Sequence, residues 1–163
     1  MAQVRGRVLR SRFMENHHLM SNKRPINAVG VLFYSTSTNR VLYLLRNDRE
    51  QCWGIPGGKI ERGEVLREAL KRECSEEIST WQDDFKLYPL ECYTNGTFKY
   101  HTFFVAVDDE FVPRLNDEHC AYCWCEWGAF PRPLHSGLFS TVQYPIIQQK
   151  ISLILEALKQ KGP

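Results

Sequence analysis

Three glutamates that lie close together in the sequence are the residues best suited to chemistry. Glu73, Glu76 and Glu77 stand in a stretch, residues 57–80, whose pattern predicts a helix over residues 65–78. Residues three or four apart are neighbours on a helix, with Cβ atoms ~5–6 Å apart. Crowded carboxylates repel one another unless a cation lies between them, and Mg²⁺ prefers oxygen ligands of this kind. The cluster therefore predicts a divalent-cation site, against the alternative of an acidic face in solvent.

The position of these glutamates on the helix favours the metal site. The apolar residues of the predicted helix share one face, which is expected to pack on a core. They are Leu66, Ala69 and Leu70. Glu73 and Glu77 continue this face by another turn, and Glu76 lies at its margin. Carboxylates thus occupy positions where the apolar face should continue.

The spacing extends into the loop before the helix. Six residues follow the pattern G-x5-E-x7-R-E-x-x-E-E: Gly58, Glu64, Arg72, Glu73, Glu76 and Glu77. The pattern resembles the signature sequence of Nudix (MutT-like) hydrolases. Cys74 stands where a bulky aliphatic residue is usual, and Ser79 and Thr80 replace the usual Gly and aliphatic residue. Ser79 affects how the helix ends, because Gly is best suited to a left-handed C-terminal turn.

The resemblance implies both a fold and a reaction. The fold would be the α+β Nudix fold, an α/β/α sandwich around a mixed β-sheet, in a domain of residues 26–163. The reaction would be attack of water on a diphosphate linked to a nucleoside, with Mg²⁺ (or Mn²⁺) as cofactor. By position, the Gly57 carbonyl, Glu73 and Glu77 would be metal ligands. Glu76 would bind a further metal or accept the proton of the water.

Two further carboxylates and one arginine complete the expected catalytic set. The resemblance implies that Arg72 pairs with Glu64 and orients the helix, although the sequence alone equally allows a pair with Glu68 one turn earlier. Glu118 resembles the carboxylate from outside the signature that completes the metal site in MutT-like proteins. The general base remains open between Glu73, Glu76 and Glu118.

Basic residues near the signature are candidates for binding the substrate. The loops on either side of Gly57 and Gly58 contain four basic residues that could meet phosphates: Arg46, Arg49, Lys59 and Arg62. Each has the alternative of an ordinary solvated side chain. His135, in the segment PLHSGL, is a candidate for the lining of the substrate pocket.

The remaining elements are expected to surround the predicted helix. Apolar and β-branched runs predict strands over residues 26–35, 40–45, 86–93, 97–107 and 122–127, the first two forming a hairpin. A final helix is predicted over residues 143–160, with Pro145 in its first turn. Its apolar residues are Ile147, Ile151, Ile154, Leu155 and Leu158.

Composition limits the partners and the location. A chain of 163 residues with a formal charge of +2 has no strongly basic field, so nucleic acid is not expected as a partner except as a 5′ RNA end. No apolar run approaches the ~18 residues of a membrane span. We expect a cytoplasmic monomer or homodimer that acts on a small nucleotide.

Two features have alternative interpretations. Residues 1–25 are rich in Arg and poor in acidic residues, which predicts a disordered basic tail or, alternatively, a targeting presequence. The set Cys120-x2-Cys123-x-Cys125 suggests zinc, but alternation in a strand would place Cys123 and Cys125 on one face as small core residues. We expect six reduced thiols.

These observations lead to one leading function and two alternatives. The leading hypothesis is Mg²⁺-dependent hydrolysis of a nucleoside triphosphate, including an oxidised one, to the monophosphate and pyrophosphate. The first alternative is a sugar-nucleotide hydrolase of the ADP-ribose or GDP-mannose type, including a GDP-mannose mannosyl hydrolase. The second is a nucleotide-binding sensor without turnover.

Overall fold

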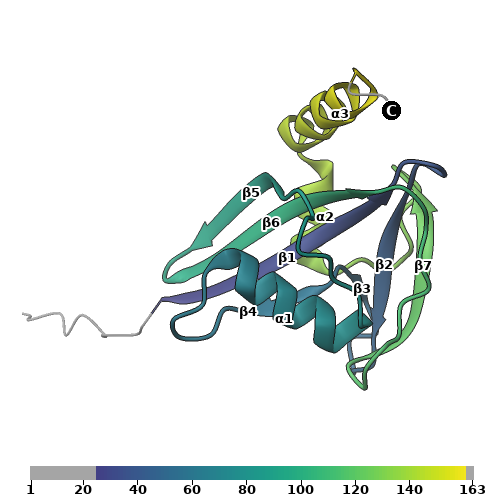
Figure 1. Ribbon diagram of the computed structural model, residues 1–163. Coiled ribbons are helices and arrows are strands. Elements are labelled where there is room, and N and C mark those ends of the chain that lie inside the picture. Colours follow the sequence, from purple (N-terminus) through teal and green to yellow (C-terminus); the bar gives the residue numbers. More distant parts are fainter. Residues whose placement is uncertain (1–24, 161–163) are drawn as a thin grey trace, which may run out of the picture.

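Seven strands and three helices form the part of the chain, residues 25–160, that the computed structural model describes (Figure 1). The strands are β1 (Ile26–Ser35), β2 (Arg40–Arg46), β3 (Trp53–Gly54), β4 (Gly57–Lys59), β5 (Tyr88–Asn95), β6 (Phe98–Val107) and β7 (His119–Glu126). The helices are α1 (Leu66–Ile78), α2 (Ser136–Gln143) and α3 (Pro145–Gln160). The predicted basic tail lies almost entirely outside the described residues. None of the described helices is long and apolar enough to cross a membrane.

Strand β1 is the centre of a mixed sheet. It pairs in parallel with β6 from Ile26↔Phe98 to Ser35↔Val107, and antiparallel with β4 on its other side. β5 pairs antiparallel with β6, while β2 pairs with the end of β1 and then with β3 and β7. The middle of β1 is buried on both faces, which explains its continuous apolar sequence.

Alternate residues of β1 contribute to two cores on opposite faces of the sheet. Val29, Val31 and Phe33 pack with α1 in the first core. Leu32 and Tyr34 belong to the second core, which α2 and α3 cover. The arrangement is the predicted α+β sandwich, with α1 on one face of the sheet and α2 and α3 on the other (Figure 1).

Most of the predicted strands are present, with shifted ends. The bounds of β1 and its hairpin with β2 are confirmed, and β2 extends by one residue to Arg46. β5 lies two residues later than predicted, and β6 begins one residue later, at Phe98. β7 begins three residues earlier than predicted and ends one residue earlier. The sequence analysis missed β3 and β4, which have only two and three residues.

The predicted final helix is present as α3 but begins two residues later than predicted, and the sequence analysis missed α2 before it. Gln143 ends α2, Tyr144 is extended with φ −68° and ψ 122°, and α3 begins at Pro145. The residue before a proline is disfavoured in the helical conformation, so Tyr144 separates the two helices. Ile147 and Ile151 are the buried residues of α3, in agreement with the predicted apolar face.

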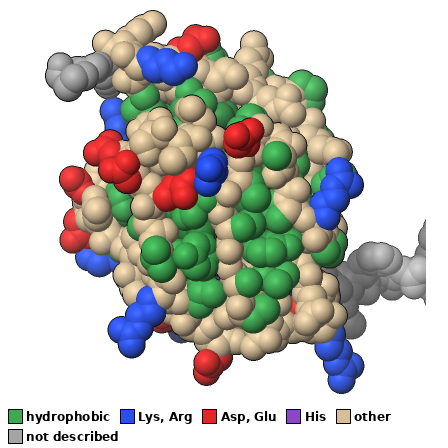
Figure 2. Space-filling model, turned by 90° about the vertical axis from the view of Figure 1, so that its right-hand side faces the viewer, with side chains coloured by type: hydrophobic (Ala, Val, Ile, Leu, Met, Phe, Trp, Pro, Cys, Tyr) green, Lys and Arg blue, Asp and Glu red, His purple; other side chains and the backbone are tan. Residues whose placement is uncertain are grey.

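The side of the molecule formed by β2 and β7 exposes hydrophobic side chains between charged ones (Figure 2).

All six cysteines are unpaired, and Cys123 and Cys125 both pack against the second core, with their Sγ atoms 3.5 Å apart. Cys120 instead directs its thiol at the carbonyls of Leu45 and Arg46. Cys120 therefore does not join the other two thiols as the zinc interpretation would require.

Candidate metal and catalytic site

Helix α1 begins at a loop whose carboxylates bind backbone N–H groups. Val65 is the extended residue before the helix, and its N–H donates to the Glu68 carboxylate at 3.0 Å. The Glu64 carboxylate accepts a hydrogen bond of 2.8 Å from the N–H of Glu61. Glu68 therefore stabilises the start of the helix, as acidic residues in a first turn do.

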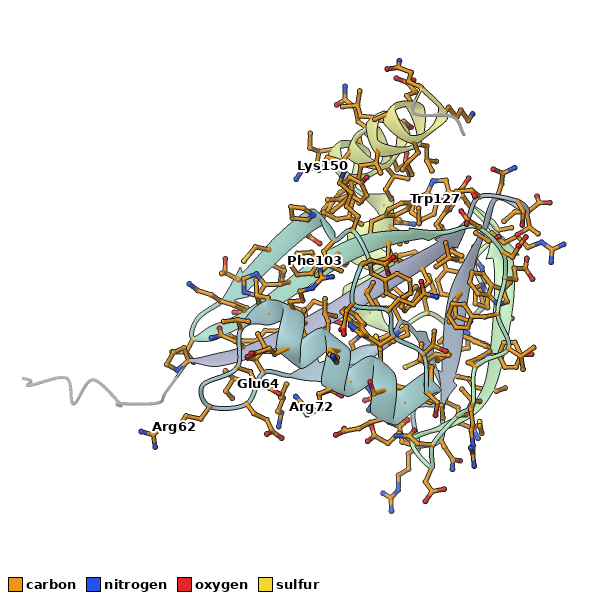
Figure 3. All side chains as sticks on the ribbon, viewed as in Figure 1. Arg62, Glu64, Arg72, Phe103, Trp127 and Lys150 are labelled. Carbon is orange, nitrogen blue, oxygen red and sulfur yellow. The ribbon has the colours of Figure 1, made fainter. Side chains whose placement is uncertain are left out.

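Arg72 joins the loop, β4 and the helix. Its Nε and Nη2 donate to the two oxygens of Glu64 at 2.8 and 3.1 Å, and its Nη1 donates to Glu73 at 2.8 Å. Nη2 also donates to the carbonyl of Lys59 at 2.8 Å. Glu64 and Arg72 lie together beside the start of α1 (Figure 3). The structure thus places Arg72 on Glu64 and not on Glu68.

The charges of this pair stabilise each other. The hydrogen bonds from Arg72 lower the pKa of Glu64, and the hydrogen bonds to Glu64 raise the pKa of Arg72. Both groups therefore stay ionised over a wide pH range. A planar guanidinium that binds both carboxylate oxygens fixes direction as well as charge.

Glu73 lies directly against the backbone of Gly58. A Cβ atom at position 58 would be 2.4 Å from Oε1 of Glu73, so a side chain there would displace the carboxylate. Only 12% of the Glu73 side chain is exposed, and burial raises the pKa of its carboxyl despite the bond from Arg72. Gly58, the glycine of the signature, is therefore needed for close approach of the carboxylate.

Glu77 is the most buried carboxylate of the site. Its residue is 3% exposed, and its Oε2 accepts a hydrogen bond of 2.8 Å from the Gly57 N–H. Burial, followed by the charges of Glu73, Glu118 and Glu76, raises its pKa to about 8. A buried carboxylate beside like charges is costly unless it is protonated or binds a cation.

The other two candidate ligands lie at the edge of the site. The Glu76 side chain is 57% exposed, with an oxygen 3.6 Å from Nη1 of Arg72. Glu118 precedes β7 in an exposed loop, and its charge raises the pKa of both Glu73 and Glu77, so it faces the same region. The structure brings Glu64, Arg72, Glu73 and Glu77 together around Gly57 and Gly58, with Glu76 and Glu118 nearby.

The donor set fits a hard divalent cation. No three His, Cys, Asp or Glu side chains of residues 25–160 already form a complete metal-binding group. Mg²⁺ does not require one, because it keeps several waters and binds proteins through one or two carboxylates. Glu73 and Glu77, with a backbone carbonyl of the glycine loop, meet this requirement.

The candidate substrate-binding residues are more scattered. Arg46 donates from Nε to Asp48 at 2.7 Å, so it is already paired. Arg49 and Lys59 are exposed, and Arg62 extends away from α1 into solvent (Figure 3). His135 precedes α2, where its Nδ1 accepts a hydrogen bond of 3.3 Å from the Gly137 N–H.

One connection near the site was missed from the sequence. The Trp53 N–H donates to the Pro133 carbonyl, and the His135 N–H donates to the Trp53 carbonyl, both at 2.8 Å. The segment before α2 therefore runs beside β3, close in sequence to the glycine loop. No local signal predicts a contact between residues about eighty positions apart.

Two carboxylates of helix α1 thus lie against the glycine loop of an α+β sandwich, Glu73 in a hydrogen bond with Arg72 and Glu77 in one with the Gly57 N–H. This arrangement is the one expected of a hydrolase that uses a divalent cation. The family model described as NUDIX domain matches residues 24–144. The chain belongs to the Nudix hydrolase family.

Individual relatives agree with this assignment. The chain is 30% identical over 123 residues to dihydroneopterin triphosphate diphosphatase of Haemophilus influenzae, a match that covers 65% of this chain and 77% of the relative. The solved structure of the E. coli dihydroneopterin triphosphate pyrophosphohydrolase superposes with a TM-score of 0.62 at 26% identity, covering 78% of this chain and 94% of that one. A MutT Nudix hydrolase from Burkholderia pseudomallei shares the fold, with a TM-score of 0.58 at 23% identity, covering 74% of this chain and 98% of that one.

Proposed function

We propose that this protein hydrolyses the diphosphate linkage of an organic triphosphate with Mg²⁺ (or Mn²⁺), releasing the organic monophosphate and pyrophosphate. A nucleoside triphosphate is the leading substrate. The observation that carries the proposal is the pair of desolvated carboxylates, Glu73 and Glu77, held against Gly58 and Gly57. Such a pair is suited to bind a divalent cation, and hydrolysis of a polyphosphate also requires a cation to neutralise the phosphates.

The proposed residue roles follow from these contacts. Glu73 and Glu77, with the Gly57 carbonyl, would hold the cation, and Glu76 or Glu118 would complete its surroundings. A bound Mg²⁺ supplies charge neutralisation for the phosphates and lowers the pKa of bound water. Arg72 fixes the direction of the Glu73 carboxylate through its bonds to Glu64.

The proton of the attacking water requires an acceptor. Glu73 already accepts a hydrogen bond from Arg72, and Glu77 accepts one from Gly57. Glu76 and Glu118 are the exposed carboxylates beside them. We assign the role of general base to one of these two.

The comparisons support a triphosphate substrate. The names of two relatives, one from Haemophilus influenzae and one from E. coli, specify dihydroneopterin triphosphate. Dihydroneopterin triphosphate is therefore the second candidate substrate beside the nucleoside triphosphates.

The experiment is a substrate panel with Mg²⁺ in which every product is resolved. The panel contains the ordinary and oxidised nucleoside triphosphates, dihydroneopterin triphosphate, ADP-ribose and GDP-mannose. Organic monophosphate plus pyrophosphate from a triphosphate supports the proposal. A sugar phosphate or a free sugar as the main product would contradict it, and so would binding of nucleotides without any turnover.

The metal assignment is tested by Glu73→Gln. The amide keeps the shape of the side chain but removes the charge, so we expect turnover to fall ~10²–10³-fold. Glu156→Gln, in an exposed part of α3, is the matched control and should retain activity. A thermal unfolding curve for each variant checks that it is folded. A Glu73→Gln variant with normal turnover across pH would refute the assignment.

A further inference from the structure

We propose that Tyr100 positions the substrate at this site, with its ring beside the organic part of the triphosphate and its hydroxyl donating a hydrogen bond to that part. This inference rests on the proposed function. Tyr100 lies on β6, outside the signature, where it pairs with Ala28 of β1 and Tyr93 of β5.

The hydroxyl of Tyr100 fills the space of a missing side chain. A Cβ atom at Gly30 would lie 2.2 Å from the hydroxyl oxygen, 3.0 Å from Cζ of Tyr100 and 3.1 Å from Cδ1 of Ile55. Any side chain at position 30 would therefore displace the phenol. Glycine at this position is needed for the hydroxyl to lie where it does.

Gly30 also connects the hydroxyl with the metal site. Gly30 pairs directly with Gly57 across β1 and β4, and a Cβ at Gly57 would lie 2.6 Å from the Cα of Gly30. The Gly57 N–H in turn donates to Glu77. The phenol oxygen, the two glycine backbones and the Glu77 carboxylate thus follow one another across two strands.

Strand alternation shows on which face of the sheet the hydroxyl lies. Val29 and Val31, on either side of Gly30, face α1. Position 30 therefore points to the opposite face, towards Ile55, which packs with the second core. A substrate whose phosphates reach Glu73 and Glu77 can place its organic part beside the Tyr100 hydroxyl, because Gly30 and Gly57 present no side chains between them.

The surroundings suit a hydrogen-bond donor for an organic group. Tyr100 is only partly exposed, and its ring centroid lies 6.4 Å from that of Phe98. Ile55 lies beside the same Gly30 position as the hydroxyl, so the neighbours of Tyr100 here include apolar side chains. Burial, followed by the charges of Glu77 and Glu73, raises the pKa of the phenol. The hydroxyl therefore keeps its proton and can donate a hydrogen bond to an oxygen or nitrogen acceptor.

The first test is Tyr100→Phe, which removes only the hydroxyl. With the best triphosphate of the panel, we expect KM to rise about 5–10-fold, the effect of one neutral hydrogen bond, while kcat changes less than about 2-fold. The affinity for Mn²⁺ should not change. Tyr122→Phe, on the exposed side of β7, is the matched control and should leave KM unchanged. A folded Tyr100→Phe variant with wild-type KM would overturn the inference.

The second test uses Gly30. Gly30→Ala places a methyl group where the hydroxyl lies, so it should raise KM as Tyr100→Phe does. The clash between the new methyl group and the hydroxyl should also lower the thermal midpoint of Gly30→Ala. In the double variant Gly30→Ala/Tyr100→Phe the hydroxyl is absent, so part of this lost thermal midpoint should be recovered. KM of the double variant should match that of Tyr100→Phe alone. Additive effects on KM would contradict a role of the hydroxyl.

The two proposals fail in different ways. If the wild-type protein turns over no triphosphate, the proposed function fails, and this inference fails with it. If the wild type is active and Tyr100→Phe is equal to it, only the role of Tyr100 is refuted.

Discussion

Arg72 connects three parts of the site that local structure alone does not bring together. It binds Glu64 in the loop, Glu73 on the helix and the Lys59 carbonyl of β4. Lysine would keep the positive charge but could not reach these acceptors with a planar fork. The arginine is therefore required for its geometry.

We predict that Arg72→Lys lowers kcat/KM ~10–100-fold, as is usual when a partner that orients a metal ligand is lost. Steady-state kinetics with Mg²⁺ measures the effect. Arg67→Lys is the control, because Arg67 on the same helix binds the carbonyls of Asp83 and Phe85 instead. Equal losses in both variants would indicate general damage to α1 rather than a role of Arg72 at the site.

Some residues of the site can be predicted from the sequence and others cannot. Glu73, Glu77 and Arg72 can be found from spacing, because helix periodicity determines which side chains are neighbours. The contact of Tyr100 with Gly30 cannot, because it depends on the register between strands about seventy residues apart. Register is decided by the packing of both sheet faces and not by local sequence.

At the scale of elements, α1 is followed directly by a residue in a conformation that non-glycine residues disfavour. Ser79 has φ 53° and ψ 32°, the left-handed region, and its N–H bonds the Cys74 carbonyl. Ser79, in place of the usual Gly, therefore lowers the stability of the helix end. The left-handed residue and its hydrogen bond still close the helix as a Gly would.

We predict that Ser79→Gly raises the free energy of unfolding by about 0.5–1 kcal/mol, since the left-handed conformation costs a non-glycine residue more than the flexibility of Gly does. Urea unfolding measures this difference. Ser75→Gly, within the same helix, should instead lower stability by about 0.5 kcal/mol. Activity should be unchanged in Ser79→Gly, and a destabilised variant would contradict the explanation.

The elements themselves were predictable where periodicity extends over many residues. β1, β6 and α1 have long regular patterns, and their positions agree with the sequence to within one residue. β3 and β4 are too short to show a period, and α2 was hidden because Pro131, Pro133 and Pro145 surround it. These elements exist because of pairing with β1 and β2 and packing on the second core.

For the whole molecule, the buried carboxylates couple stability to pH and to metal. The pKa of Glu77 is about 8 in the folded chain against an ordinary value of 4.5, so between these pH values the folded state binds more protons than the unfolded state. Without metal, its contribution to stability is complete below about pH 4.5 and is lost as pH rises through 8. On the proposed metal assignment, added Mg²⁺ should oppose this loss, because it would bind the ionised carboxylates of the folded state.

We therefore predict that the thermal midpoint of the protein in chelator falls between pH 5 and pH 8 more steeply than that of Glu77→Gln, which cannot ionise there. The comparison is necessary because His119 acts in the opposite direction: burial lowers its pKa, so its contribution to stability rises with pH. Both proteins contain His119, and the difference between their slopes isolates Glu77. Mg²⁺ should raise the wild-type midpoint more at pH 8 than at pH 5, and raise that of Glu77→Gln far less. Parallel slopes in the two proteins would show that Glu77 is not the buried acid that couples folding to the metal.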